Sequence, residues 1–157
     1  MAAAGKWKVY EKAKVNLGGL VLDLTSTSNW NMALFLSTSN CNTLSGSEVY
    51  GDLTNEVSNA NGYTTGGVAI GSETWTNSAG TVTWASANGI WTASGGSITA
   101  RFAVIYKNAT VNGKVKPILC VCLLDTTPAD VSAPDGQALT VQINASGVLT
   151  LSGAAVD

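Results

Sequence analysis

Carboxylates are the side chains of this 157-residue chain best suited to acid–base chemistry, because it has no histidine. Without histidine, the Ser-His and Cys-His nucleophile arrangements are excluded. Paired carboxylates can hydrolyse glycosidic bonds, and the candidate pairs are Asp52 with Glu56 and Asp125 with Asp130. In the structural alternative, Asp52 and Glu56 accept hydrogen bonds from backbone amides of their own loop. We favour this alternative and expect no catalytic residue and no small-molecule substrate.

Three tryptophans bear on the same question. Trp75, Trp84 and Trp91 could line a cleft for sugar, which would make the protein a carbohydrate-binding module with tryptophans exposed on one face. Alternatively they fill or cap the interior of a β-sandwich. We expect the second arrangement.

The cysteines predict neither a disulfide nor a metal site. Cys120 and Cys122 are two residues apart, so on a strand they share one face, where a disulfide is strained. A zinc site without histidine would need four thiolates, and the chain has three cysteines, the third being Cys41. We therefore expect buried, reduced thiols, synthesis in a reducing cytosol and no cofactor.

Composition limits the classes of partner. Charged residues make up 11% of the chain, against about a quarter in ordinary soluble domains. The net charge of −2 argues against nucleic-acid binding. The start, MAAAGKWK, lacks the apolar core of a signal peptide, and no apolar run reaches membrane-spanning length, so no membrane contact is expected. The length fits a single domain, residues 1–157.

A cluster of lysines marks the beginning of the chain. Lys6, Lys8, Lys12 and Lys14 lie in the first fourteen residues and form either a solvated face or a contact to an acidic neighbour. We expect residues 1–8 to form an N-terminal arm against another subunit. Residues 7–17 fit either an alternating strand or a helical stripe, and Gly18-Gly19 would end such a helix.

The segment Tyr50–Gly67, YGDLTNEVSNANGYTTGG, is too polar for a core strand and too rich in glycine for a long helix. We expect an ordered loop across a sheet, with Glu56 accepting backbone hydrogen bonds and Tyr63 packed on the sheet. Asn61-Gly62 is a strong turn signal. Candidate assembly contacts on this loop and the N-terminal arm are Lys6, Lys8, Tyr50, Asp52, Glu56, Asn61 and Tyr63.

Strand patterns dominate the rest of the chain. About eight strands separated by turn residues predict an all-β fold, an antiparallel β-sandwich or jelly roll, with at most one short N-terminal helix. The segments 32–36, 97–107 and 116–125 are apolar enough to be central strands. The other expected strands are 68–76, 81–86, 89–92, 138–144 and 147–151, with a hairpin connection at 77–80 and a turn at Asn112-Gly113.

Four motifs together resemble one bacteriophage family. They are DLTNEVSNANGYTTGG (52–67), WTASGGSITARFAVIYK (91–107), KPILCVCLLDTTPADV (116–131) and INASGVLTL (143–151), joined by WKVYEKAK and MALFLSTSN. They are similar to small virion-associated proteins of tailed phages and prophages. The resemblance favours the helix within residues 7–17 and implies a virion component made in the host cytoplasm. It implies a capsid decoration protein, or alternatively a tail or fibre protein, whose partners are the major capsid protein and further copies of itself.

Overall fold

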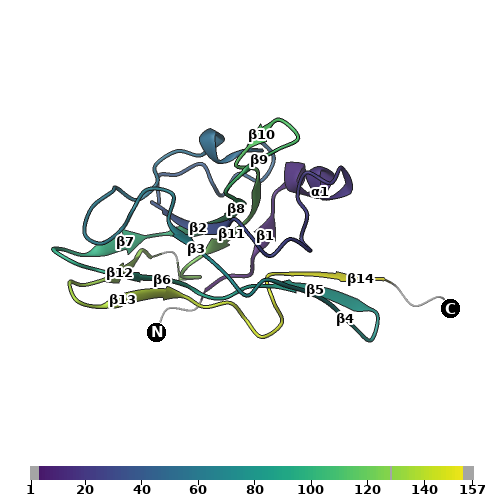
Figure 1. Ribbon diagram of the computed structural model, residues 1–157. Helices are drawn as coiled ribbons and strands as arrows, with labels where there is room; N and C mark the ends of the chain where they lie inside the picture. The colour runs from purple at the N-terminus through teal and green to yellow at the C-terminus, as the bar shows by residue number, and fades with distance from the viewer. Residues whose placement is uncertain (1–3, 128, 154–157) are drawn as a thin grey trace.

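The computed structural model describes residues 4–127 and 129–153 of the chain, and the described part is built almost entirely from β-strands (Figure 1). One α-helix, α1 (Glu11–Gly18), and one 3-10 turn, η1 (Tyr50–Asp52), accompany them. The strands are β1 Lys8–Val9, β2 Trp30–Phe35, β3 Val68–Ala69, β4 Thr74–Ser78, β5 Thr81–Ala85, β6 Gly89–Thr92, β7 Ile98–Ala100, β8 Phe102–Lys107, β9 Thr110–Val111, β10 Lys114–Val115, β11 Ile118–Leu123, β12 Val131–Ala133, β13 Ala138–Val141 and β14 Leu149–Ser152.

The strands form two main layers (Figure 1). The upper layer is an antiparallel sheet in the order β1-β11-β8-β2-β3, and the lower layer combines β14-β5-β4 with β13-β6. Short pairs, β12-β7 and β10-β9, complete the structure. The expected all-β fold with one short helix is confirmed. The winding of a jelly roll stays a prediction.

One long, folded hairpin runs through both layers. Its tip is the β9–β10 turn, where Asn112 (φ 47°) and Gly113 (φ 77°) adopt the left-handed conformation that such tight turns require. From this tip, β8 pairs with β11, β7 with β12, β6 with β13 and β5 with β14, all antiparallel. The hairpin folds back on itself. The pair next to the tip, β8 with β11, therefore lies in the upper layer, and the pairs far from the tip, β6 with β13 and β5 with β14, lie in the lower layer (Figure 1).

The chain changes layer at Arg101, which corrects the expected single strand 97–107. Arg101 alone separates β7 from β8, whereas seven residues, 124–130, separate β11 from β12 on the opposite arm. The Arg101 Nε donates to Asp130 Oδ1 at 2.6 Å, and the Arg101 carbonyl accepts from the Leu124 amide at 3.0 Å. The unequal lengths bend the ribbon, and the Arg101–Asp130 ion pair fixes the bend.

Three other expected strands are also corrected. The range 68–76 contains two strands, β3 and β4. The Ile70 amide still bonds the Trp30 carbonyl in register with β2, and the chain then turns at Ser72, which has a φ of 57°. The range 138–144 ends as a strand at Val141, where the amide of Ile143 turns to the Asn88 side chain instead. The final strand begins at Leu149, and it pairs with β5 rather than with β13.

A single hydrophobic cluster fills the space between the layers. The expected central strands supply much of it: β2, β8 and β11 consist almost entirely of buried residues. Trp30 from the upper layer packs on Trp84 from the lower layer, with ring centroids 5.1 Å apart. The prediction that the segments 32–36, 97–107 and 116–125 contribute central strands is therefore confirmed within the corrected bounds.

Truncation of Phe102 tests this core. Phe102 lies opposite Phe35 on β2 and Leu123 on β11 and is 8% exposed. We expect Phe102→Ala to lower the free energy of unfolding by about 3–5 kcal/mol, because it removes a large buried ring and leaves a cavity. Urea titration measures the loss. A loss below about 1 kcal/mol would show that the position is not part of a packed core.

The beginning of the chain is a strand followed by a helix, so both patterns in residues 7–17 have a physical counterpart. Lys8 and Val9 pair with Val121 and Cys120 of β11. Helix α1 then buries Ala13 and Asn16, and the Gly19 amide caps its end by bonding the Val15 and Leu17 carbonyls.

The described part of the expected N-terminal arm lies on its own sheet. The Gly5 amide donates to the Leu123 carbonyl at 2.7 Å, which extends the pairing of β1 with β11. Lys6 and Lys8 point outward and are exposed, while Trp7 and Val9 pack against the core. Residues 4–8 are therefore anchored by their own chain, and residues 1–3 of the arm lie outside the described residues.

All three cysteines are buried and free, as predicted. Cys120 and Cys122 lie on β11, and the Tyr10 hydroxyl donates to the Cys41 carbonyl at 2.6 Å. Burial raises the pKa of Cys41 and of Cys122 to about 11, and it raises the pKa of Cys120 well above the ordinary value.

Thiol labelling should be slow in the native protein. A rise in thiol pKa from 9.0 to about 11 lowers the reactive thiolate fraction at pH 8 about 100-fold, and burial blocks the reagent as well. We expect iodoacetamide to label the protein in urea at least about 100-fold faster than without urea. Mass spectrometry of digested samples measures each cysteine. Fast native labelling of Cys120 would contradict its place in the core.

Candidate functional site

The loop Tyr50–Gly67 is ordered and completes the exposed edge of β2. One side of β2 pairs with β8, and β3 covers only Asn31 and Met32 on the other side. Next along that edge, the Leu34 amide donates to the Tyr63 hydroxyl at 3.0 Å and the Leu34 carbonyl accepts from Val57 at 2.9 Å. Glu56 then forms a bridge with Phe35. The loop thus provides partners for a central strand that would otherwise present an open edge.

Glu56 fastens this loop to itself, as predicted. Its Oε1 accepts one hydrogen bond from the Gly66 amide at 2.6 Å and another from the Tyr63 hydroxyl at 2.7 Å. The Tyr106 hydroxyl donates to the Gly66 carbonyl at 2.8 Å, which ties the far end of the loop to β8. Because a carboxylate acceptor strengthens such bonds, Glu56 acts as a clamp between the two halves of the loop. We call Glu56, Tyr63, Gly66 and Tyr106 the Glu56 clamp.

Aromatic rings extend the Glu56 clamp towards η1. Tyr50 stacks on Tyr106 with ring centroids 4.3 Å apart and meets the edge of Phe35 at 5.9 Å. The Lys116 ammonium lies 5.6 Å from the Tyr50 ring centroid. Burial, reinforced by the nearby Glu56 charge, raises the pKa of Tyr50 far above the ordinary value and that of Tyr106 to about 12. Both phenols are therefore neutral at physiological pH, and the Tyr106 hydroxyl acts as a donor while the buried Tyr50 hydroxyl has no hydrogen-bond partner among the described residues.

Asn61 and Asp52 also have structural roles. Asn61 and Gly62 have φ values of 54° and 85°, so the predicted tight turn is confirmed. The Asn61 side chain donates to the Ser97 carbonyl at 3.1 Å and so anchors the turn to the start of β7. Asp52 Oδ2 accepts from the amides of Glu48 and Val49 at 2.8 and 3.0 Å.

Replacement of Glu56 tests the Glu56 clamp. We expect Glu56→Gln to lower the free energy of unfolding by about 1–2 kcal/mol, because two charge-assisted hydrogen bonds become neutral ones. Thermal unfolding and urea titration measure the loss. Glu11→Gln, at an exposed position on α1, is the matched control and should change stability little. An unchanged stability in Glu56→Gln, together with loss of a hydrolytic activity, would instead favour the enzyme hypothesis.

The carboxylates considered for catalysis each have separate bonds. Asp125 Oδ1 accepts from the Thr127 amide and hydroxyl at 3.0 and 2.7 Å, and Asp130 binds Arg101. Asp52 and Glu56 accept different amides at different points of the loop. The hydrogen-bonding role expected for Asp52 and Glu56 is therefore confirmed.

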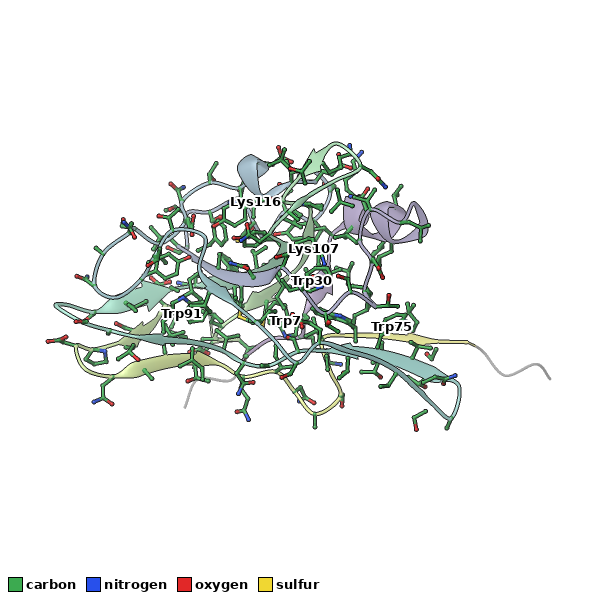
Figure 2. All side chains as sticks on the ribbon, viewed as in Figure 1. Trp7, Trp30, Trp75, Trp91, Lys107 and Lys116 are labelled. Atoms are coloured by element: carbon green, nitrogen blue, oxygen red, sulfur yellow. The ribbon has the colours of Figure 1, made fainter. Side chains whose placement is uncertain are left out.

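The tryptophans fill the interior, as expected. Trp30, Trp84 and Trp91 are buried, and Trp7 and Trp75 are partly buried against the same core. Figure 2 places Trp30 and Trp91 between the two layers. The exposed tryptophan face that a carbohydrate-binding module would need is absent from residues 4–127 and 129–153, which removes the main support for that alternative.

The burial of two charged side chains was not predicted from the sequence. Lys107 and Glu73 are each 6% exposed. The Lys107 ammonium donates to the Ser28 carbonyl at 2.6 Å and to the Ser26 hydroxyl at 2.9 Å, and it lies 4.9 Å from the Trp30 ring centroid (Figure 2). Burial lowers the pKa of Lys107, and the charges of Asp23 and Glu73 act against this shift. No signal in the local sequence distinguishes these residues from exposed ones.

Charge is distributed unevenly over the fold. Residues 74–100 carry no charged side chain, and residues 131–152 carry only Asp135. These two segments contain every strand of the lower layer, and they also contain β7 and β12. All eight basic residues therefore lie outside the lower layer, on the upper layer, the N-terminal segment, α1, the bend at Arg101 and residues 114–116 at β10.

A groove of about 1260 Å³ opens between the N-terminal segment and the edge of the lower layer. Its walls come from residues 4–7 and 9 on one side and from residues 138–150 on the other, with Cys122, Leu124 and residues 131–133 between them. Lys6 is the one charged residue among these lining residues. This groove could not be expected from the sequence, because its walls are far apart along the chain.

The chain matches no protein-family model, no curated protein and no solved structure. In the described residues, no helix is long and apolar enough to cross a membrane, and no cluster of acidic and cysteine side chains is suited to hold a metal ion.

Proposed function

We propose that this protein is a non-enzymatic structural component of a bacteriophage virion, a capsid decoration protein that binds the assembled shell and stabilises it. The observation that carries the proposal is the Tyr50–Gly67 loop. Its carboxylates and tyrosines are committed to holding a fixed loop conformation on a rigid sheet. Such a loop presents a preformed surface, which lowers the entropic cost of binding a neighbour.

The surface chemistry supports an assembly role. A lower layer with one charged residue can approach neighbouring subunits without the cost of burying unpaired charge. Exposed Lys6 and Lys8 suit an acidic patch on the major capsid protein. Because many equivalent sites are occupied on one shell, weak contacts suffice through avidity. Binding only the assembled state stabilises that state by mass action.

The resemblance of the chain to small virion-associated proteins points to the phage setting. Copy number distinguishes the two locations that this resemblance implies. A decoration protein should be present in hundreds of copies per particle, whereas a tail or fibre protein should be present in a few to some tens.

The test is quantitative densitometry of purified virions against the major capsid protein. A ratio near one copy per capsid protein or per capsomer supports decoration. A ratio equal to that of known tail proteins would replace decoration by the tail role. Complete absence from purified virions would overturn the structural proposal. Particles that lack this protein should then also be compared for heat stability, because a decoration protein predicts earlier shell rupture in its absence.

A further inference from the structure

The edge of β13 has no strand partner on the side of the groove. Ala93 donates to the Gln137 carbonyl, and the pairing of Leu139 with Trp91 keeps the same register. Backbone groups in an antiparallel strand alternate between the two sides. The odd-numbered residues therefore bond β6, and the amides and carbonyls of Ala138 and Thr140 face the groove, which both residues line. Within the described residues, no strand pairs with this side of β13.

The opposite wall of the groove is also a free strand edge. The Tyr10 amide donates to the Leu119 carbonyl at 3.1 Å, and Lys8 lies opposite Val121. By the same alternation, the backbone groups of Trp7 and Val9 face away from β11. Trp7 and Val9 line the groove. Two unpaired edges therefore border one groove, an arrangement suited to an added strand.

The groove is suited to an uncharged polypeptide rather than to a small molecule. Its volume of about 1260 Å³ exceeds the roughly 300–1,000 Å³ of small-molecule pockets. Lys6 is the only charged side chain in the lining. Leu139, Val141 and Val148 supply apolar surface, and the backbone of both edges supplies donors and acceptors.

The β4–β5 hairpin has the two properties that a strand added to this groove would need, a lack of charge and a free strand edge. It projects from the lower layer at the end opposite β12 and β13 (Figure 1). Residues 74–87 carry no charge, and β4 pairs with β5 alone among the described strands. Soluble proteins usually protect such edges with lysine, proline or a bulge, and β4, TWTNS, has none of these.

We propose that the β4–β5 hairpin of one copy docks in the groove of a second copy, where the edge of β4 pairs with the edge of β13. The two edges are similar in length, five and four residues, and both lack charge, so neither like-charge repulsion nor burial of charge opposes the contact. The hairpin and the groove lie on different parts of the molecule. The contact is therefore heterologous and generates a ring or a filament. This inference does not depend on the virion role.

Mixed cross-linking tests the contact directly. Cysteine is introduced singly at Thr76 or Asn77 on the hairpin and at Thr140 on the groove edge, all of which are exposed. Each hairpin variant is mixed with Thr140→Cys and treated with a short bis-maleimide. The buried native cysteines give a low background. The matched control is Ser45→Cys, at an exposed loop position outside the groove lining.

We expect at least one hairpin variant to form a mixed dimer with Thr140→Cys at least tenfold more efficiently than with Ser45→Cys. Equal yields with both partners would overturn the proposal. Cross-links between two hairpins that exceed the mixed product would also overturn it, because they indicate a symmetric contact.

A charge variant provides the second test. Thr140→Lys should weaken self-association at least tenfold in light scattering over a concentration series, because it puts a charge on the accepting edge. Ser45→Lys should leave it unchanged. Circular dichroism confirms that each variant is folded, and Ala138→Lys replaces Thr140→Lys if the latter is not. A wild-type protein that stays monomeric throughout the series would overturn the proposal.

Discussion

Between pH 9 and pH 11 the protein should lose most of its stability and unfold. Thiols and phenols buried in neutral form are the cause. Burial raises the pKa of Cys41 and Cys122 from 9.0 to about 11, raises that of Tyr106 from 10.0 to about 12, and raises those of Tyr10, Tyr50 and Tyr63 further. In the unfolded chain these groups ionise at their ordinary pKa values, so high pH favours unfolding.

The direction and the size of this change in stability follow from the linkage between proton binding and folding. Below pH 9 the groups are neutral in both states and their contribution to stability is complete. Above pH 9 the unfolded thiols ionise first and the unfolded phenols follow near pH 10, so stability falls as the pH rises. A two-unit rise corresponds to about 2.7 kcal/mol per thiol, and domains of this kind have about 5–15 kcal/mol in total. The contribution of Lys107 to stability changes in the opposite direction, because burial lowers its pKa. This single group is outweighed by the several thiols and phenols whose pKa values are raised.

Far-ultraviolet circular dichroism during a pH titration, with urea midpoints at pH 8, 9, 10 and 11, measures this loss. The variant Cys122→Ala is the control, because removing one raised thiol should make the decline between pH 9 and pH 11 shallower. A urea midpoint that stayed constant up to pH 11 would show that these groups are accessible to water in the native protein.

Gly67→Ala should be among the most destabilising single substitutions in the chain. Gly67 has a φ of 68°, and a Cβ atom there would lie 1.9 Å from the Met32 carbonyl oxygen and 2.7 Å from the Ala33 Cα. Both atoms belong to β2, a central strand of the upper sheet. The backbone of β2 or the Tyr50–Gly67 loop must therefore move. We expect a loss of about 4 kcal/mol or more, which is typical of severe steric conflicts.

Gly80→Ala is the matched control. Gly80 has a similar φ of 79°, but nothing lies within 4 Å of an added Cβ. Gly80→Ala should lower the free energy of unfolding only by the strain of the left-handed conformation, about 1–2 kcal/mol. Urea titration of both variants separates strain from collision. Equal losses in the two variants would show that the loop does not rest closely on β2.

Local features of this protein were predictable from sequence because their physical causes lie within a few residues. Asn61-Gly62 and Asn112-Gly113 form tight turns because asparagine and glycine tolerate positive φ. Burial of β2, β8 and β11 follows from apolar residues on both faces of each strand. Reduced cysteines follow from their number and spacing. Glu56 could be assigned a backbone-binding role because a loop so rich in amides needs acceptors.

Tertiary structure alone decided which segments meet. A period-two pattern gives the face of a strand but not its neighbour, so the pairing of β13 with β6 and of β14 with β5 could not be inferred. The same holds for the change of layer at Arg101, where one residue on one arm faces seven residues on the other. The Tyr63 hydroxyl on Leu34, the buried Lys107 and the groove beside β13 join residues that are distant along the chain. Such contacts depend on how the whole ribbon folds back, which no local pattern encodes.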